Sequence, residues 1–242
     1  MGATFYHPPI SLVAMSSAVH NTLIKICGLT READVLACVQ AGANAIGFVM
    51  YPPSARYVSP ERANILAKLL PPDITPVLLF VNASLEDVLA ACQAVPNALL
   101  QFHGDESPAE CERLAHAVNR PYWRAARIPT ESTTSFDLVK FSQDYSNAQA
   151  ILLDAHVDGY GGGGKTFNWS QLPPNVNAHL VLSGGLTPAN VTDGILQVRP
   201  RCTTLAVDVS SGVEVSKGIK SADKINQFVA AVRAADQQFA SI

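Results

Sequence analysis

The feature that most constrains this fold is a repeated alternation of two sequence patterns. A short, continuous apolar run is followed by a longer segment with apolar residues at helical spacing. Continuous apolar runs are typical of strands covered on both faces, and helical crossovers between such strands imply a parallel sheet. The eight runs cover residues 23–27, 45–50, 76–81, 98–102, 122–128, 150–153, 179–182 and 204–209.

Eight βα units predict a (β/α)8 barrel, the TIM-barrel architecture of the α/β class. The length of 242 residues is ordinary for one such barrel. A doubly wound open sheet is the competing architecture. Since the chain shows no linker, we expect one barrel domain over residues 21–242, preceded by an extension of residues 1–20.

Composition narrows the function classes. Apolar residues make up 48% of the chain and charged residues 15%, which favours a large core, and the net charge of −3 argues against a strongly basic nucleic-acid surface. No apolar run reaches the roughly 18–20 residues of a membrane span. The five cysteines are irregularly spaced without a CxxC pair, so we expect free thiols, a cytoplasmic location and no metal.

Several local signals predict where helices begin. Thr30, Ser59 and Ser84 are expected N-caps, and Ser84 has Asp87 three residues later, as in a capping box. Thr187 before a proline is expected to start a later helix. The glycine-rich stretch 159–164 is interpreted as a mobile lid, and only a short helix is expected after it.

Active sites of such barrels lie at the carboxyl ends of the strands, so polar residues that end the apolar runs are candidates. Cys27 and Asp154 form the candidate acid–base pair. Lys25 lies on the same strand face as Cys27 and is expected to lower the pKa of its thiol. The alternatives are that Cys27 is a small buried hydrophobe and that Asp154 is an N-cap or an ion-pair partner.

Other strand ends suggest ligand contacts. The glycine-containing segments 183–185 and 210–212 follow the seventh and eighth runs, where backbone N–H groups commonly bind phosphate, although both could be simple turns. Arg56 is either a clamp for a carboxylate or a solvated loop charge. His103 is either a titrating group or a hydrogen-bonded scaffold, and Asp208 is expected to pair with Lys25.

Together these residues resemble the phosphoribosylanthranilate isomerase family of tryptophan biosynthesis. The similarity begins near residue 22 and continues to the C-terminus in the order of the family pattern. The segments that carry it include 25–30 (KICGLT), 80–82 (FVN), 101–106 (QFHGDE), 153–154 (LD), 183–186 (SGGL) and 208–214 (DVSSGVE).

The resemblance implies a cofactor-free Amadori rearrangement of N-(5-phosphoribosyl)anthranilate to 1-(2-carboxyphenylamino)-1-deoxyribulose 5-phosphate. It implies that Cys27 is the general base and Asp154 the general acid. The residues expected to bind this small phosphorylated substrate are Arg56, His103, Gly184, Gly185, Asp208, Ser210, Ser211 and Gly212. We expect no nucleic-acid or membrane partner, and either a monomer or a homodimer.

Two alternatives stay open at this point. A related isomerase of histidine synthesis relies on paired aspartates, one of them at the end of the first strand, where this chain has Cys27. A non-catalytic sensor of phosphorylated sugars would share the fold, but the presence of both Cys27 and Asp154 argues against it.

Overall fold

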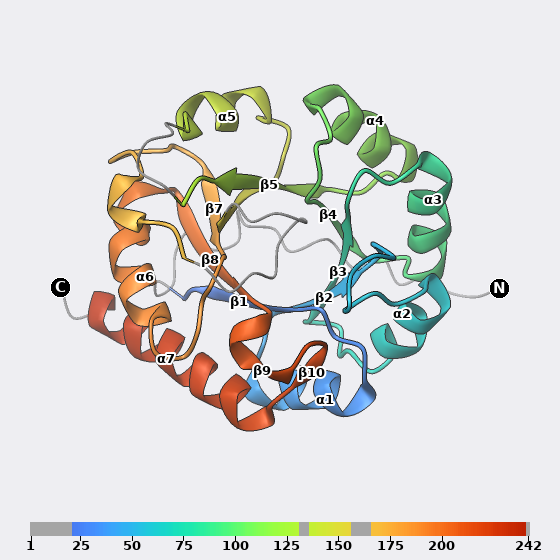
Figure 1. Cartoon of the computed structure of the whole chain (residues 1–242), viewed down its shortest axis with the longest axis horizontal. Helices are drawn as coiled ribbons and strands as arrows, with labels where there is room; N and C mark the ends of the chain where they lie inside the picture. The colour runs from blue at the N-terminus through green and yellow to red at the C-terminus, as the bar shows by residue number, and fades with distance from the viewer. Residues whose placement is uncertain (1–20, 131–135, 156–165, 241–242) are drawn as a thin grey trace.

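The chain folds into a closed barrel of eight parallel strands, which confirms the predicted (β/α)8 class (Figure 1). The computed structural model describes residues 21–130, 136–155 and 166–240. The barrel strands are β1 Leu23–Cys27, β2 Ala45–Val49, β3 Thr75–Phe80, β4 Leu99–Phe102, β5 Tyr122–Ile128, β6 Ala150–Ala155, β7 His179–Leu182 and β8 Thr204–Val209.

Pairing between the first and last strands excludes the open sheet. Each strand pairs with the next one in the chain, and β8 returns to pair with β1, with Lys25 opposite Asp208. This closure brings the carboxyl ends of all eight strands to one mouth, and therefore gathers residues that lie far apart in the sequence.

Helices surround the barrel on its outside (Figure 1). They are α1 Glu32–Ala41, α2 Pro60–Ala67, α3 Leu85–Ala94, α4 Pro108–Val118, α5 Leu138–Asp144, α6 Val191–Val198 and α7 Ala222–Ala240. Between β6 and β7 the described residues contain only the 3₁₀ turn η2 Trp169–Gln171, as the sequence suggested. After β8 come the 3₁₀ turn η4 Ser211–Val213 and a small hairpin of β9 Glu214–Ser216 and β10 Ile219–Lys220.

The capping predictions had mixed outcomes. Ser59 accepts a hydrogen bond at the start of α2, and Ser84 forms a full capping box with Asp87 at α3. Thr30 was wrong as an N-cap, because its hydroxyl donates instead to the carbonyl oxygen of Gly218 on the β9–β10 hairpin. The predicted start at Thr187 was also wrong, because that residue begins a turn and α6 starts at Val191.

Side chains alternate between the helices and the barrel interior. The inward-facing set begins with an apolar layer that includes Ala45, Val77, Leu99, Trp123, Leu152 and Val181. Nearer the mouth the same faces carry Lys25, Gln101 and Asp208, all of them buried. Polar chemistry is therefore concentrated at one end of an otherwise apolar interior.

Two sequence predictions fall outside the described residues: the extension of residues 1–20 and the glycine-rich stretch 159–164. Among the helices that the structure describes, none is both long and apolar enough to cross a membrane.

Candidate active site

Cys27 ends β1 at the barrel mouth, with 4% of its surface exposed. Around it lies an apolar cluster of Val49, Leu79 and Val81, with Tyr51 packed against them. Since these residues come from the ends of the first three strands, they form an apolar wall on one side of the mouth.

Two buried charges lie beneath the thiol. The Lys25 Nζ atom donates to Asp208 Oδ1 at 2.8 Å, as the sequence predicted, and both side chains are almost fully buried. The Lys25 ammonium also interacts with Cys27 and acts to lower the pKa of the thiol. Burial is the larger effect, however, and raises that pKa. The expectation that the pKa of Cys27 is lowered overall was therefore wrong. It took the charge of Lys25 into account but not the loss of hydration that burial causes.

The thiol has room only because its neighbour on β2 is a glycine. Gly47 pairs with Cys27, and a Cβ atom at Gly47 would lie 2.6 Å from Cys27 Sγ and 3.1 Å from Lys25 Cε. Any side chain at this position would displace the groups that define the chemistry of Cys27.

Asp154, near the end of β6, is hydrogen-bonded to His103, which is in turn hydrogen-bonded to Gln101; all three side chains are buried. His103 Nε2 lies 3.0 Å from Asp154 Oδ2, and His103 Nδ1 lies 3.0 Å from Gln101 Nε2. Both ring nitrogens are thus engaged within the protein. The hydrogen bonds of His103 are directed to Asp154 and Gln101, and its contact with substrate stays a prediction.

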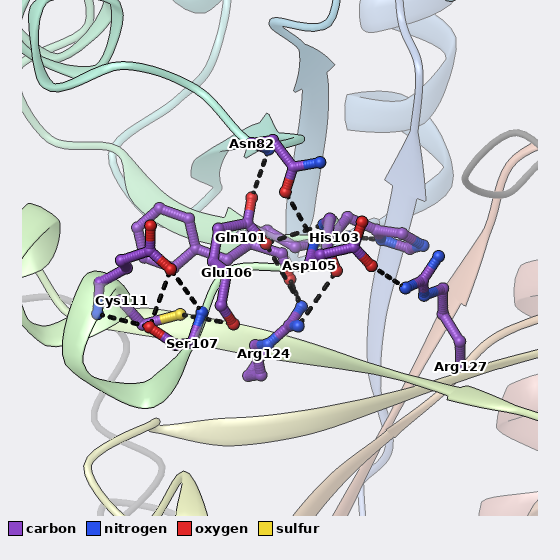
Figure 2. Close-up of polar contacts among 12 residues, drawn as sticks. Asn82, Gln101, His103, Asp105, Glu106, Ser107, Cys111, Arg124 and Arg127 are labelled. Carbon is purple, nitrogen blue, oxygen red and sulfur yellow. Dashed lines mark hydrogen bonds and ion pairs between the residues drawn. The ribbon is translucent and has the colours of Figure 1, made fainter.

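The loop that carries His103 is held by a second network (Figure 2). Glu106 accepts hydrogen bonds from the backbone N–H groups of Asn82 at 2.7 Å and Gly104 at 2.8 Å. Arg124 donates to the carbonyl oxygens of Phe102 and Gly104, each at 3.1 Å. Bonds from both sides fix the backbone next to His103, and with it the position of the imidazole ring.

Arg56 is tied into a buried ion-pair cluster, so it is not a solvated loop charge. Its Nε and Nη2 atoms donate to the two carboxylate oxygens of Glu214, both at 2.8 Å. Lys220 Nζ donates to Glu214 Oε1 at 2.8 Å and to the Ser210 carbonyl oxygen at 3.1 Å. Burial acts to raise the pKa of Glu214, but the two cations outweigh it and lower that pKa.

Gly28 allows Arg56 to cross the end of β1. Its φ is +77°, and a Cβ atom there would lie 2.5 Å from Arg56 Cδ and 3.2 Å from Ser210 Oγ. Ser210 in turn donates to the Cys27 carbonyl oxygen at 3.0 Å. The Arg56 cluster is therefore attached directly to the backbone of the candidate base.

The loops after β7 and β8 lie in close contact, as a shared ligand site requires. A Cβ atom at Gly212 would lie 1.9 Å from the Leu186 carbonyl oxygen, so only glycine fits there. Gly184 and Gly185 both have positive φ values, of 76° and 64°. Ser211 and Gly212 belong to η4, and Gly212 packs against Leu186, the residue that follows these glycines. Two backbone segments are thus brought to the same part of the mouth.

Comparison with known proteins agrees with this architecture. Residues 24–231 match the sequence model described as N-(5′-phosphoribosyl)anthranilate (PRA) isomerase. The isomerase of Methylibium petroleiphilum is 59% identical over 221 residues, covering 91% of this chain and 98% of the relative. That of Leptothrix cholodnii is 61% identical over 216 residues, covering 89% and 93%. The chain belongs to the N-(5′-phosphoribosyl)anthranilate isomerase family.

Membership of this family makes the chain an isomerase of tryptophan biosynthesis. Among solved members, that of Thermotoga maritima superposes with a TM-score of 0.77 at 38% identity, covering 88% of this chain and 99% of its own. Another family structure, with a TM-score of 0.74 at 36% identity and the same coverage, is a complex with reduced 1-(o-carboxyphenylamino)-1-deoxyribulose 5-phosphate.

Sequence reasoning missed several residues of the site. Gln101 lies in the family segment 101–106 but was given no role of its own, and Lys220 has no local signal, because its partner Glu214 belongs to another strand of the small hairpin. Glu214 belongs to the family motif, but its bond to Arg56 spans 158 positions. Gly47 could have been noticed as a glycine inside an apolar strand, a sign that another group approaches closely.

Proposed function

We propose that the chain converts N-(5-phosphoribosyl)anthranilate into 1-(2-carboxyphenylamino)-1-deoxyribulose 5-phosphate, with Cys27 as general base and Asp154 as general acid. The observation that carries the proposal is the pairing of a buried thiol and a buried carboxyl at the ends of β1 and β6, around one mouth. Acid and base must act on different atoms of one sugar, which requires that they come from separate strands.

The proton transfers of the reaction balance with Asp154 as the acid and Cys27 as the base. Asp154 gives its proton to the furanose ring oxygen, the C1′–O4′ bond breaks, and the anilino nitrogen forms a C=N bond to C1′. The Cys27 thiolate then takes the proton from C2′ and leaves an enolamine, which becomes the ketone as O2′ loses a proton and C1′ gains one. One proton has left Asp154 and one has reached Cys27, so the cycle closes when that proton returns through water.

Arg56 is proposed to hold the anthranilate carboxylate. A guanidinium matches a carboxylate geometrically, and the apolar wall of Val49, Leu79 and Val81 beside Cys27 suits an aromatic ring. Because Glu214 already occupies two of the Arg56 donor atoms, the substrate carboxylate would use the remaining donors or displace part of this pair.

The phosphate is proposed to bind between the loops after β7 and β8. The contacts would come from the segments containing Gly184, Gly185, Ser210, Ser211 and Gly212, where positive φ values and close packing support a cradle of backbone N–H groups. Asp208 lies below this cradle and pairs with Lys25, so we assign it to positioning that cation.

We propose that the reaction needs no cofactor, since proton transfer accounts for each step. A cytoplasmic location is proposed from the five free cysteines, which suit a reducing compartment. The chain is proposed to be a monomer or a homodimer; the Thermotoga maritima isomerase is described as dimeric.

The test is conversion of freshly prepared phosphoribosylanthranilate by the purified full-length chain, followed by the loss of substrate fluorescence. We expect turnover in the presence of a metal chelator, with kcat in the usual range of roughly 1–10³ s⁻¹. A protein that binds the substrate without consuming it would contradict the proposed function and support a sensor of phosphorylated sugars.

A further inference from the structure

Gln101, His103 and Asp154 form a line of three buried polar side chains across β4 and β6. Gln101 is fully buried, while His103 and Asp154 are 5% and 7% exposed. Gln101 and His103 are two residues apart and therefore lie on the same face of the extended chain. Two contacts of 3.0 Å, one at each ring nitrogen, join the three groups.

The donor and acceptor roles along this line follow from Gln101. Its amide nitrogen faces His103 Nδ1, and an amide nitrogen can only donate. Nδ1 must therefore accept, and the proton of the neutral ring lies on Nε2. That N–H donates to Asp154 Oδ2.

We propose that Gln101 fixes the tautomer of His103 and thereby reserves the acid proton of Asp154 for its other oxygen, Oδ1. This inference rests on the proposed role of Asp154 as general acid. Oδ2 accepts from His103 both before and after proton transfer. The transferred proton leaves from Oδ1 to the ring oxygen of the sugar, and His103 keeps its own proton throughout.

The position of Oδ1 fits this assignment. A Cβ atom at Gly184 would lie 3.0 Å from Oδ1 and 2.5 Å from the Ala155 backbone nitrogen. Oδ1 is thus beside the glycine loop after β7, where one end of the substrate is proposed to bind. Oδ2 contacts His103, whereas Oδ1 lies beside Gly184 of the proposed phosphate site.

Gln101 is also an unfavourable residue for the apolar interior of the barrel. Its Oε1 atom has no hydrogen-bond partner among the described residues, and an unpaired buried carbonyl oxygen destabilises a fold. An apolar side chain of similar length would remove that unpaired oxygen but would leave His103 Nδ1 without a donor. Directing the His103 ring explains why an amide is present instead.

In the competing arrangement the Gln101 amide is rotated by a half-turn, so that its oxygen and not its nitrogen faces His103. With Oε1 against the ring, Nδ1 would carry the proton and Nε2 would become an acceptor. An acceptor facing a carboxylate oxygen is repulsive, so the acid proton would then have to lie on Oδ2, between the ring and Asp154. The two arrangements place the acid proton on different oxygens and differ in the tautomer of His103.

The tautomer can be measured directly in the full-length enzyme labelled with ¹⁵N-histidine. Long-range ¹H–¹⁵N correlation at pH 8.5 distinguishes the two nitrogens, and the His103→Gln variant assigns the signals. We expect the Nε2–H form in the wild type. An Nδ1–H form would overturn the proposal, whatever role Asp154 has.

Two variants then test whether Gln101 causes the preference. Gln101→Met removes the donor and should give both tautomers, with kcat about tenfold lower and KM little changed. That loss is smaller than the ~10²–10⁴ expected for removing the acid itself. Gln101→Glu replaces the donor by an acceptor and should favour the Nδ1–H form.

The matched control is Leu99→Met, which changes an inward-facing apolar residue of the same strand that makes no hydrogen bond to Gln101, His103 or Asp154. Its His103 tautomer and kcat should stay as in the wild type. If Gln101→Met or Gln101→Glu keeps the pure Nε2–H form, Gln101 does not fix the tautomer and the proposal fails. If the tautomers change as expected but Asp154→Asn keeps full turnover, the tautomer assignment stands, while the acid role of Asp154 and the proton on Oδ1 fall.

Discussion

At the scale of single residues, the pKa of the Cys27 thiol is set by effects of opposite sign. Burial raises the pKa of its thiol, the Lys25 ammonium opposes this, and the Asp208 carboxylate adds to the rise. Burial thus disfavours the thiolate form that a base must supply, and Lys25 favours it. Replacing either charged neighbour should shift this balance in a direction fixed by its sign.

Turnover gives the first test of the two reacting groups. Cys27→Ala and Asp154→Ala should each lower kcat by ~10²–10⁴, the usual contribution of a general acid or base, and leave the fold intact. Cys202→Ala, a thiol on the outside of the barrel near the end of α6, should turn over normally. A Cys27→Ala enzyme with more than about a tenth of wild-type kcat would remove Cys27 from the mechanism.

Alkylation gives the second test, in a variant whose other four cysteines are replaced. The pH midpoint for alkylation of Cys27 should lie above the ordinary value of about 8.5, because burial raises the pKa of the thiol. Asp208→Asn should move the midpoint down, and Lys25→Met should move it further up. Shifts in the same direction for both variants would contradict the electrostatic account.

At the scale of elements, the site depends on how closely neighbouring strands approach. β1 supplies Lys25 and Cys27, but β2 must leave space beside them, and Gly47 provides it. The strand pairing and the active-site geometry are thus set by the same contact.

Gly47→Ala should therefore harm both stability and activity. The new methyl would clash with Cys27 Sγ and Lys25 Cε, at an expected cost of about 1–3 kcal/mol in the free energy of unfolding, with a fall in kcat. Gly42→Ala is the matched control, since Gly42 has a φ of +85° and nothing within 4 Å of its added Cβ. It should lose stability from backbone strain alone and keep kcat, as urea unfolding and the fluorescence assay can establish.

At the scale of the whole molecule, the C-terminal helix α7 is hydrogen-bonded to the residue that precedes the first strand. Asp236 on α7 accepts hydrogen bonds from the Thr22 backbone N–H at 3.1 and 3.0 Å and from the Thr22 hydroxyl at 2.6 Å. Arg199 and Arg233 donate to the same carboxylate, at 2.5 and 3.2 Å. This buried cluster joins β1, the end of α6 and α7, far from the mouth.

Removing that carboxylate should lower stability without altering the chemistry. Asp236→Ala takes the buried carboxylate away from two partly buried arginines, and we expect a loss of about 3–5 kcal/mol in the free energy of unfolding. Asp144→Ala breaks an exposed pair with Lys140 on α5 and should cost far less, because solvent screens exposed ion pairs. Equal losses in the two variants, measured by chemical denaturation, would show that the cluster does not fasten the barrel.

Acid stability should depend on Glu214. Its pKa is lower in the folded protein than in the unfolded chain, so it contributes stability that is fully present above about pH 4.3 and is lost as pH falls through the folded pKa. Glu214→Gln should be less stable than the wild type near pH 7, and the gap in Tm should narrow on acidification. Glu86→Gln, at an exposed carboxyl of α3, serves as control; a constant gap for Glu214→Gln would refute the linkage.

The sequence by itself determined the barrel and the residues at its mouth. Alternating apolar runs and helical segments report local geometry, and this was enough to predict eight parallel strands and to place Cys27, Asp154 and the two glycine loops at their carboxyl ends. Lys25 and Asp208 could be paired because both face inward on the strands that close the barrel.

Only the tertiary structure decided how the side chains combine. The contacts of Arg56 with Glu214 and of His103 with Asp154 depend on loop paths and barrel stagger, which no local periodicity encodes. The direction of the Cys27 pKa shift likewise needed the depth of burial as well as the neighbouring charge, because desolvation and Coulomb attraction oppose one another and only the folded geometry sets their balance.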